Sequence, residues 1–571
     1  MINIERTLVS HYPQLLAQPG AKWLIKLLRA ITHEDEINEF IQANQHLRGF
    51  HFLDKVLETF QFDYQVAASE LKRIPAEGRV MIVANHPIGS LDGLALLKLV
   101  RSVRPDVRIV ANQLLSELEP IRSLFIPIDN MSGKVSQKQQ YKAMKQALED
   151  DQALIIFPAG EVSRIRPNGV RDGKWKAGFL RLALKTDAPI LPIRIEARNS
   201  ALFYSLSAIY KPLGTAMLIE EMFKQEQRGL VFHVGKLILP KTLVALDLDQ
   251  DLLAARFRKH IYRLGTPKKL RKPPLFAEVN TIAHPVDGKA LRKALRAAEL
   301  LGQTSDGKHI YLYDFQENCP VMDEIGRLRE LTFRTVEEGT GLPSDIDAYD
   351  RYFRHLVLWD DEALDIVGAY RIGEGARIVA EKGLAGFYSA SLFELDEPLL
   401  PKLQQGIELG RSFVQPKYWG MRSLDYLWYG IGAYLKAHPE VQYLFGPVSL
   451  SAAYPEPAKQ KILSFYWQQF GAKLPGVQGH TPYLLSESTL TAAQADYAQD
   501  YATSFKRLNY QLEQDGVKVP TLYKQYTELC EPGGCEFHGF NLDADFGGCV
   551  DSFILVSLDK VKPKKRQRYL G

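Results

Sequence analysis

A histidine and an aspartate share one short, glycine-bearing segment, Asn85-His86-Pro87-Ile88-Gly89-Ser90-Leu91-Asp92-Gly93. The segment directly follows Val80–Ala84, an apolar run typical of a buried strand. A turn at a strand end can hold an imidazole where it takes a proton from a hydroxyl group. A nearby carboxylate fixes the ring tautomer and stabilises the imidazolium that forms. The pattern predicts a general base at His86 oriented by Asp92; the alternative is a turn histidine without a catalytic role.

A second polar motif follows the apolar run Ala153–Phe157. It reads Phe157-Pro158-Ala159-Gly160-Glu161-Val162-Ser163-Arg164. Loops at strand ends are where α/β folds place ligands, so Glu161 and Arg164 can contact a polar headgroup there. Five basic residues follow and make this edge positively charged: Arg166, Arg171, Lys174, Lys176 and Arg181. Further on, Ala188-Pro189-Ile190-Leu191-Pro192-Ile193 is a proline-bracketed strand candidate.

Taken in order, these blocks resemble the lysophospholipid acyltransferase family, including its hemolysin-like branch. The resemblance covers about residues 65–240. It implies transfer of a fatty acyl group from a thioester to a hydroxyl. In that reaction His86 would deprotonate the acceptor and Asp92 would orient the ring. By the same resemblance, Gly160, Glu161 and Arg164 would contact the headgroup.

Two features differ from the family's common pattern. Five residues, rather than the usual four, separate His86 from Asp92, and the acid Glu161 follows the glycine of its block instead of preceding it. The hemolysin-like branch resembles the chain on both counts. A moved acid disfavours a glycerol phosphate acceptor. Glu161 and Arg164 in one loop better match an acceptor that carries both an ammonium and a carboxylate group.

The second half of the chain carries polar residues on four short segments. They are Arg329-Glu330-Leu331-Thr332-Phe333-Arg334 on a periodic helix at 322–337, Asp347-Ala348-Tyr349-Asp350 in a loop, Gly368-Ala369-Tyr370-Arg371 at a strand end, and Glu408-Leu409-Gly410-Arg411. Each has an ordinary explanation. Arg329 and Phe333 can pack on one helix face, and Glu408 and Arg411 can form an i,i+3 pair. The two aspartates can be solvated loop acids.

The ordered set resembles the acyl-homoserine-lactone synthases and the ornithine N-acyltransferases, over about residues 305–480. These enzymes have an acetyltransferase-like fold and move acyl groups from acyl carrier protein to an amine. The resemblance implies Glu408 as a catalytic acid or base, because an amine must lose its proton before it attacks a thioester. The implied substrate-binding residues are Arg329, Phe333, Asp347, Asp350, Arg371 and Arg411.

Composition is that of a large globular enzyme. Of 571 residues, 46% are hydrophobic and 24% charged, which supports a sizeable core and two or three domains. Lysine and arginine total 71 against 67 acids, and a net charge of +4 does not indicate a nucleic-acid partner. No apolar run approaches the ~18 residues of a membrane-spanning helix, and the first residues lack a signal-peptide layout. We expect a cytoplasmic protein, peripheral on the inner membrane.

Four cysteines in the whole chain indicate a reducing compartment. Three of them, Cys530, Cys535 and Cys549, lie near His538 and raise the question of a zinc site. The spacing lacks a Cys-x-x-Cys pair and isolates the histidine, which favours structural thiols over a metal. We expect no metal and no other cofactor.

Alternating apolar runs and helical patterns predict an α/β fold in both halves. We place an O-acyltransferase domain at 1–264, with a helical segment at about 1–72. A basic, proline-bearing linker at 265–280 follows, and an N-acyltransferase domain occupies 281–571. The linker has an alternative explanation as a basic surface loop. A final basic stretch at 560–568 is either a solvated tail or a segment attracted to anionic lipid.

The combination of the two halves resembles the bifunctional ornithine lipid synthases of bacteria. The resemblance implies that the C-terminal half acylates ornithine with a 3-hydroxyacyl group from acyl carrier protein. The N-terminal half then acylates the 3-hydroxyl of that lyso-ornithine lipid at the membrane surface. Three alternatives stay open: a glycine or other amino-acid lipid synthase, a lysophosphatidic acid acyltransferase, and a membrane-active hemolysin-like binding protein.

Overall fold

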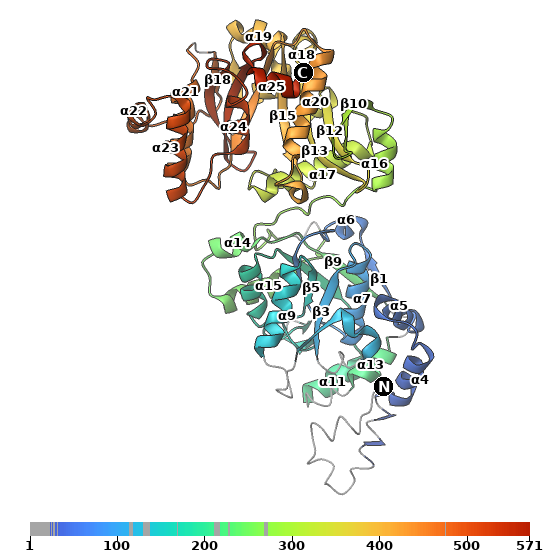
Figure 1. Cartoon of the computed structure of the whole chain (residues 1–571). Coiled ribbons are helices and arrows are strands. Elements are labelled where there is room, and N and C mark those ends of the chain that lie inside the picture. The colour runs from blue at the N-terminus through green and yellow to red at the C-terminus, as the bar shows by residue number, and fades with distance from the viewer. Residues whose placement is uncertain are drawn as a thin grey trace. The chain divides into compact units, whose positions relative to one another are not determined.

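The computed structural model describes residues 32–571 except 113–117, 129–136, 168, 210–216, 226–228, 268–271 and 474–475, together with residues 23, 25, 26, 29 and 30. Contacts divide the chain into two compact units, Met1–His284 and Pro285–Gly571 (Figure 1). Part of the segment expected to be a linker packs on unit 1, because Phe276 is buried and Val279 pairs with Leu237. The basic residues 268–271 of that segment lie outside the described residues.

Unit 1 is built on a seven-stranded sheet in the order β1-β9-β8-β2-β5-β3-β4. Neighbouring strands are parallel except for β8 and β9. The strands are β1 (Asp63–Val66), β2 (Val80–Ala84), β3 (Val107–Asn112), β4 (Phe125–Ile128), β5 (Ala153–Ile156), β8 (Ile190–Glu196) and β9 (Gly229–Val234). A separate hairpin pairs β6 (Arg164–Arg166) with β7 (Gly169–Arg171).

Helices cover both faces of this sheet (Figure 1). They are α4 (Glu34–Ala43), α5 (Gly49–Thr59), α6 (Ala68–Leu71), α7 (Ser90–Arg101), α9 (Gln137–Glu149), α10 (Gly178–Thr186), α11 (Ala201–Ile209), α13 (Leu218–Phe223), α14 (Pro240–Ala245) and α15 (Gln250–Ile261). Alternate residues of β2 point to opposite faces: Val80 and Ile82 pack with α5 and α7, whereas Met81 and Val83 pack with α9, α10 and α15. A strand buried on both faces must be apolar throughout, which explains the continuous run before His86.

Unit 2 is built on an eight-stranded sheet in the order β10-β11-β12-β13-β15-β16-β19-β18. The strands are β10 (Glu299–Gln303), β11 (His309–Asp314), β12 (Arg354–Asp360), β13 (Asp365–Glu374), β15 (Gly406–Val414), β16 (Tyr443–Leu450), β18 (Cys535–Asp543) and β19 (Cys549–Ser557). A small second sheet pairs β14 (Phe393–Leu395) with β17 (Val477–Gly479).

Helices also pack on both faces of the unit 2 sheet. They are α16 (Gly288–Leu295), α17 (Pro320–Thr335), α18 (Gly375–Lys382), α19 (Leu400–Gln404), α20 (Ser423–Ala437), α21 (Glu456–Phe470), α22 (Glu487–Asp496), α23 (Tyr501–Gln514), α24 (Thr521–Thr527) and α25 (Pro563–Tyr569). Both units are therefore mixed α/β folds, and the predicted fold class is confirmed. Glu408 and Arg411 correct one expectation: they lie on strand β15, so they are not an i,i+3 helix pair.

Residues 563–568 of the basic C-terminal stretch lie in helix α25, so this part is not an irregular tail, although Lys564, Arg566 and Arg568 are exposed to solvent. The neighbouring Tyr569 anchors the helix. Tyr569 is buried and its hydroxyl donates to Asp425 of α20. Gly432 of α20 leaves room for this contact, since a Cβ there would lie 1.8 Å from the Tyr569 carbonyl oxygen. Among the described residues, no helix is both long and apolar enough to cross a bilayer.

The parallel pair β15–β16 stops early and opens the unit 2 sheet. Its ladder runs from Gly406↔Tyr443 to Glu408↔Phe445 and goes no further. Gly446 comes next, with φ +149°, and then Pro447, which has no N–H to donate. A Cβ on Gly446 would lie 2.3 Å from the backbone oxygen of Leu409. Glycine and proline together thus set the point at which the two strands separate.

We expect Gly446→Ala to destabilise unit 2 by about 2 kcal/mol or more. The new methyl group would clash with the backbone oxygen of Leu409, and the positive φ is strained for alanine. Thermal or urea unfolding of the purified chain measures this. Gly302→Ala in β10 is the control, since a Cβ there meets nothing within 4 Å. Equal stabilities for the two variants would contradict this account of the strand separation.

Candidate active sites in the two units

His86 lies in the turn between β2 and α7, where the carboxyl end of a central strand meets a helix N-terminus. Its Nδ1 is 2.9 Å from Oδ1 of Asp92, and about a fifth of its side chain is exposed. The ring stacks on Phe157 from the end of β5, with centroids 4.2 Å apart. With Nδ1 facing the carboxylate, Nε2 is the ring atom left to accept a proton from a substrate.

Asp92 is fully buried in the first turn of α7. Its second oxygen, Oδ2, accepts hydrogen bonds from the backbone N–H groups of Ile88 and Gly89. Gly89 has φ +110°, a conformation that side chains rarely adopt, and this lets the turn close onto the carboxylate. Asn85 fixes the other end of the turn, because its side-chain amide exchanges two hydrogen bonds with the backbone of Ile195 in β8.

A second buried carboxylate, Asp172, was not among the sequence candidates. Its Oδ1 accepts from the backbone N–H of His86 and the hydroxyl of Ser163, and its Oδ2 accepts from the indole of Trp175. Asp172 therefore ties the His86 turn to the 158–164 loop. The only sequence signal was a single acid within the basic stretch that runs from Arg166 to Arg181.

The loop predicted to contact a headgroup lies directly against the His86 turn. The Ser163 N–H donates to the carbonyl of His86 at 2.7 Å. Gly160 has φ +66° and sits beside the ammonium group of Lys176. Glu161 is about a third exposed, whereas Arg164 is largely buried, 3.6 Å from Glu161 and hydrogen-bonded to Ser207. The loop thus presents Glu161 more openly than Arg164.

Nearby carboxylates increase the proton affinity of the His86 ring. Burial lowers the pKa of His86, but the carboxylates of Asp92 and Asp172 more than offset this, so the pKa lies above its ordinary value. Burial in turn raises the pKa of Asp172. This arrangement stabilises the imidazolium that forms when the ring takes a proton, and it orients the ring before that happens.

In unit 2, five of the predicted residues form one buried chain of ion pairs. Arg329 on α17 contacts Asp350 at 2.8 Å, and Arg371 on β13 contacts Asp347 at 2.6 Å and Asp350 at 3.2 Å. Arg411 on β15 continues the chain 3.7 Å from Asp347. Burial would raise the pKa of Asp350, but Arg329 and Arg371 hold it well below its usual range. Sequence reasoning missed Asp345, which lies 3.2 Å from Arg411.

Glu408 lies beside this chain of ion pairs but faces a short 3-10 helix, Tyr388–Ser391. Both of its oxygens accept hydrogen bonds, from the N–H groups of Tyr388 and Ser389 and from the Ser389 hydroxyl. The side chain is 1% exposed, and burial raises its pKa. Glu408 thereby holds Tyr388 in place, and the Tyr388 hydroxyl accepts a hydrogen bond from Arg411.

A cavity of about 570 Å³ opens where β15 and β16 separate. Its walls include Leu409–Val414 of β15, Pro447–Ser449 of β16 and Phe333 of α17. Of the seven residues that the sequence assigned to this site, Phe333 and Arg411 line the cavity, and the other five are not part of its lining. Beyond Glu408, the edge of β15 is no longer paired with β16, so it offers backbone groups to an occupant.

The thiols considered for zinc separate in the structure. Cys530 and Cys535 belong to one buried apolar cluster, and Cys549 belongs to another on α17's side of the sheet. Within the described part of the chain, one group brings three candidate metal-ligand atoms within 4.8 Å of one another: Asp543, Cys549 and Asp551. It shares only Cys549 with the set that the sequence raised.

Comparison with known proteins assigns each half to a class of enzyme. Residues 6–245 match the family model described as acyltransferase, and residues 328–429 match that of the acetyltransferase (GNAT) domain. The protein is therefore an acyltransferase with two different transferase domains in one chain. Two aligned relatives come from Bacteroides thetaiotaomicron and a third from Brucella abortus.

A glycine N(alpha)-acyltransferase of Bacteroides thetaiotaomicron is 31% identical over 302 residues, which cover 51% of this chain and 89% of that protein. A lyso-glycine lipid O-acyltransferase of the same organism is 34% identical over 223 residues, covering 38% and 80%. An L-ornithine N(alpha)-acyltransferase of Brucella abortus is 36% identical over 140 residues, covering 23% and 46%. The chain belongs to this family of N- and O-acyltransferases.

The geometry at His86 predicts how its pKa responds to substitution. Because the Asp92 carboxylate raises that pKa, Asp92→Asn should lower it, so that the ring loses its proton at lower pH than in the wild type. NMR titration of labelled imidazoles measures this, and the His86 signal is identified as the one missing in His86→Gln. Asp54→Asn, an exposed acid on the neighbouring helix α5, is the control. An unchanged pKa in Asp92→Asn would contradict the assigned contact.

Proposed function

We propose that this chain makes an amino-acid lipid in two successive acyl transfers. Unit 2 joins a 3-hydroxyacyl group from acyl carrier protein to the α-amine of ornithine. Unit 1 then joins a second acyl group to the hydroxyl of that lyso-lipid. One observation carries the proposal: a single chain of this family contains two different sites. One is a His–Asp pair suited to activating a hydroxyl, and the other is a cavity between separated strands that Arg411 lines.

In unit 1, the acceptor hydroxyl gives its proton to Nε2 of His86 and its oxygen attacks the thioester carbonyl carbon. A C–O bond forms, the C–S bond breaks, and the thiolate leaves and takes up a proton. Asp92 keeps Nδ1 protonated and facing the helix, which reserves Nε2 for the substrate. Glu161 lies close enough to the His86 turn to meet a charged group on the same acceptor.

In unit 2, the cavity has the size of an ordinary small-molecule site, which suits the thioester end of the donor and its acyl chain. The unpaired edge of β15 beyond Glu408 supplies backbone N–H groups for the oxyanion that forms at the carbonyl. Arg411, at the cavity wall, is the group suited to the substrate carboxylate. The donor carries its own phosphopantetheine, so the reaction needs no further cofactor.

Glycine is the second candidate for the acylated amino acid. The glycine N(alpha)-acyltransferase aligns over 51% of the chain, whereas the ornithine enzyme aligns over 23%. The purified protein, supplied with 3-hydroxyacyl carrier protein and labelled amino acids, distinguishes the two. Label from ornithine should become lipid-soluble; label from glycine alone would assign a glycine lipid instead.

We further propose that unit 1 meets its acidic donor or an anionic membrane through the edge that follows the 158–164 loop. Its basic residues Arg166, Arg171, Lys174, Lys176 and Arg181 are all exposed. Acyl carrier proteins are acidic, so attraction at this edge would speed their encounter with the site. The product of the first transfer carries an acyl chain, which places the second transfer at the membrane surface.

His86→Ala should stop the pathway after the first transfer, because it removes the group proposed to deprotonate the hydroxyl. We expect O-acylation to fall by about 100-fold or more. Mass spectrometry of lipids from bacteria that express the variant should then show the monoacylated lipid accumulating. His51→Ala, an exposed histidine of the same unit, is the matched control and should make the diacylated product. Diacylated lipid from His86→Ala would refute the assignment.

Glu408→Ala should block the first transfer. The N–H groups of Tyr388 and Ser389 and the Ser389 hydroxyl lose their acceptor, and Tyr388, which contacts Arg411, is no longer held in place. We expect N-acylation to fall by about 100-fold and unit 2 to lose about 3 kcal/mol of stability. Assays of the purified variant should show that O-acylation of added lyso-lipid by unit 1 persists. Loss of both activities at a temperature where the protein stays folded would contradict the division between the units.

A further inference from the structure

Part of the cavity wall in unit 2 is an acidic recess that no role described so far uses. It consists of Glu338, which follows α17, together with Ser449 of β16 and Asp551 of β19. Ser449 and Asp551 are register partners on adjacent strands, and the Ser449 hydroxyl donates to Glu338 at 3.0 Å. Three separate segments therefore bring two carboxylates and a hydroxyl to one place on the cavity surface.

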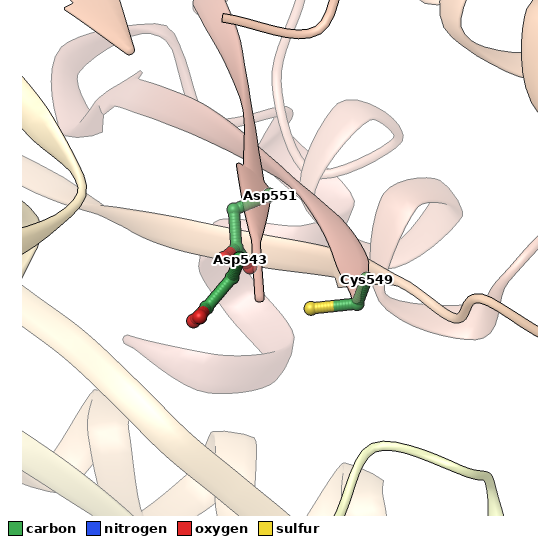
Figure 2. Close-up of side chains that lie close together, drawn as sticks. All are labelled: Asp543, Cys549 and Asp551. Atoms are coloured by element: carbon green, nitrogen blue, oxygen red, sulfur yellow. The ribbon is translucent and has the colours of Figure 1, made fainter. Parts of the chain in front are cut away.

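Asp551 is the unusual member of this recess. Its side chain is 4% exposed, it lines the cavity, and its Oδ2 has no hydrogen-bond partner among the described residues. Figure 2 shows Asp543 beside it and the Cys549 thiol pointing toward the two aspartates. Asp543 is already engaged, since its Oδ1 accepts from the N–H groups of Asp545 and Phe546. A buried carboxylate oxygen without a partner is costly unless a ligand completes it.

The recess holds more carboxyl groups than nearby cations, which makes them reluctant to ionise while no cation is bound. Burial raises the pKa of Asp551 to about 8, and the carboxylates of Asp543 and Glu338 add to this effect. Burial likewise raises the pKa of Glu338 to about 7. Arg411 is the cation that acts on both, but it lies between Asp345 and Asp347, which share its charge. A cavity wall of this kind attracts a cation that enters with the substrate.

We propose that this recess binds the ammonium group of the amino acid that unit 2 acylates, and that Asp551 takes the proton which the amine must lose. The inference rests on the proposed N-acyl transfer and adds to it the residues that receive the amine. Glu338 and Ser449 hold the amine, and the open Oδ2 of Asp551 completes its contacts.

The step balances with groups already named. A proton passes from the ammonium nitrogen to Oδ2 of Asp551, and the neutral amine attacks the thioester carbonyl carbon. A C–N bond forms, the C–S bond breaks, and the leaving thiolate takes up the proton that the nitrogen sheds on acylation. Glu408 is less suited to this step, because its two oxygens accept three hydrogen bonds and it does not line the cavity.

Asp551→Asn is the decisive variant because it keeps the shape of the side chain and removes its charge and basicity. With the full-length protein and saturating acyl carrier protein thioester, we expect kcat/KM for the amino acid to fall by about 100-fold or more. The KM for the thioester and the melting temperature should stay near their wild-type values. Asp545→Asn, an exposed acid in the turn between β18 and β19, is the matched control and should behave as wild type.

Hydroxylamine distinguishes proton transfer from a structural effect. It is largely unprotonated at neutral pH, so it need not lose a proton before it attacks. Once the spontaneous reaction with the thioester is subtracted, Asp551→Asn should lose far less activity with hydroxylamine than with the amino acid. Glu338→Gln should raise the KM for the amino acid by about tenfold, because it removes a charged hydrogen-bond partner.

Three results would overturn the recess's role. The first is wild-type amino-acid kinetics in Asp551→Asn, and the second is an equal loss with both amines. The third is a stoichiometric metal ion in the purified protein whose removal by EDTA abolishes N-acylation, since Asp543, Cys549 and Asp551 would then hold that ion. Failure of the wild type to acylate any amino acid would instead overturn the proposed function, and the recess's role with it.

Discussion

A buried carboxylate must be matched by donors or cations, and this constraint shapes both sites. Asp92 is held by two backbone N–H groups and the His86 ring, and Asp172 by a hydroxyl, an indole and another N–H. Glu408 is matched by three donors from one short 3-10 helix. Because each such group is satisfied by a different segment, the carboxylates join strand ends and loops into fixed arrangements. Oδ1 of Asp92 and Oδ2 of Asp345 lack a hydrogen bond but face a cationic partner, His86 or Arg411. Among the described residues, Oδ2 of Asp551 has neither, and a carboxyl group of this kind on a cavity wall is where a ligand cation is expected.

In unit 2 the charged chain and the cavity depend on each other. Arg329 and Asp350 are fully buried, and Arg371 of β13 pairs with Asp350. Asp347 then links this group to Arg411 of β15, which lies at the cavity wall. Breaking a buried pair leaves an uncompensated charge, so each member holds the next in place. Most of the residues that the sequence assigned to this site therefore support Arg411, whereas the cavity wall also includes residues from β16 and β19.

The sequence predicted those features that leave a local pattern. The run before His86 is apolar because β2 is covered on both faces, and the helix over 322–337 has a clear period; both were placed within two residues. Asp551 and Glu338 escaped detection because their importance comes from register and strand separation, which bring distant segments together. A sign was present: Asp551 is the one charged residue of strand Cys549–Ser557, whose other residues are apolar except for two serines. Such a charge has meaning only once its burial and its missing partner are known.

The five residues between His86 and Asp92 show why spacing alone is a weak guide to geometry. The histidine is fixed by the strand end through Asn85, and the aspartate by the first turn of α7. The turn between them needs only to connect these two anchors, and Gly89 at positive φ absorbs the added residue. A 2.9 Å contact between ring and carboxylate results despite the longer turn. The shifted position of Glu161 likewise says little by itself. The loop lies against the His86 carbonyl, and this keeps the partly exposed Glu161 beside the site that would receive the lyso-lipid.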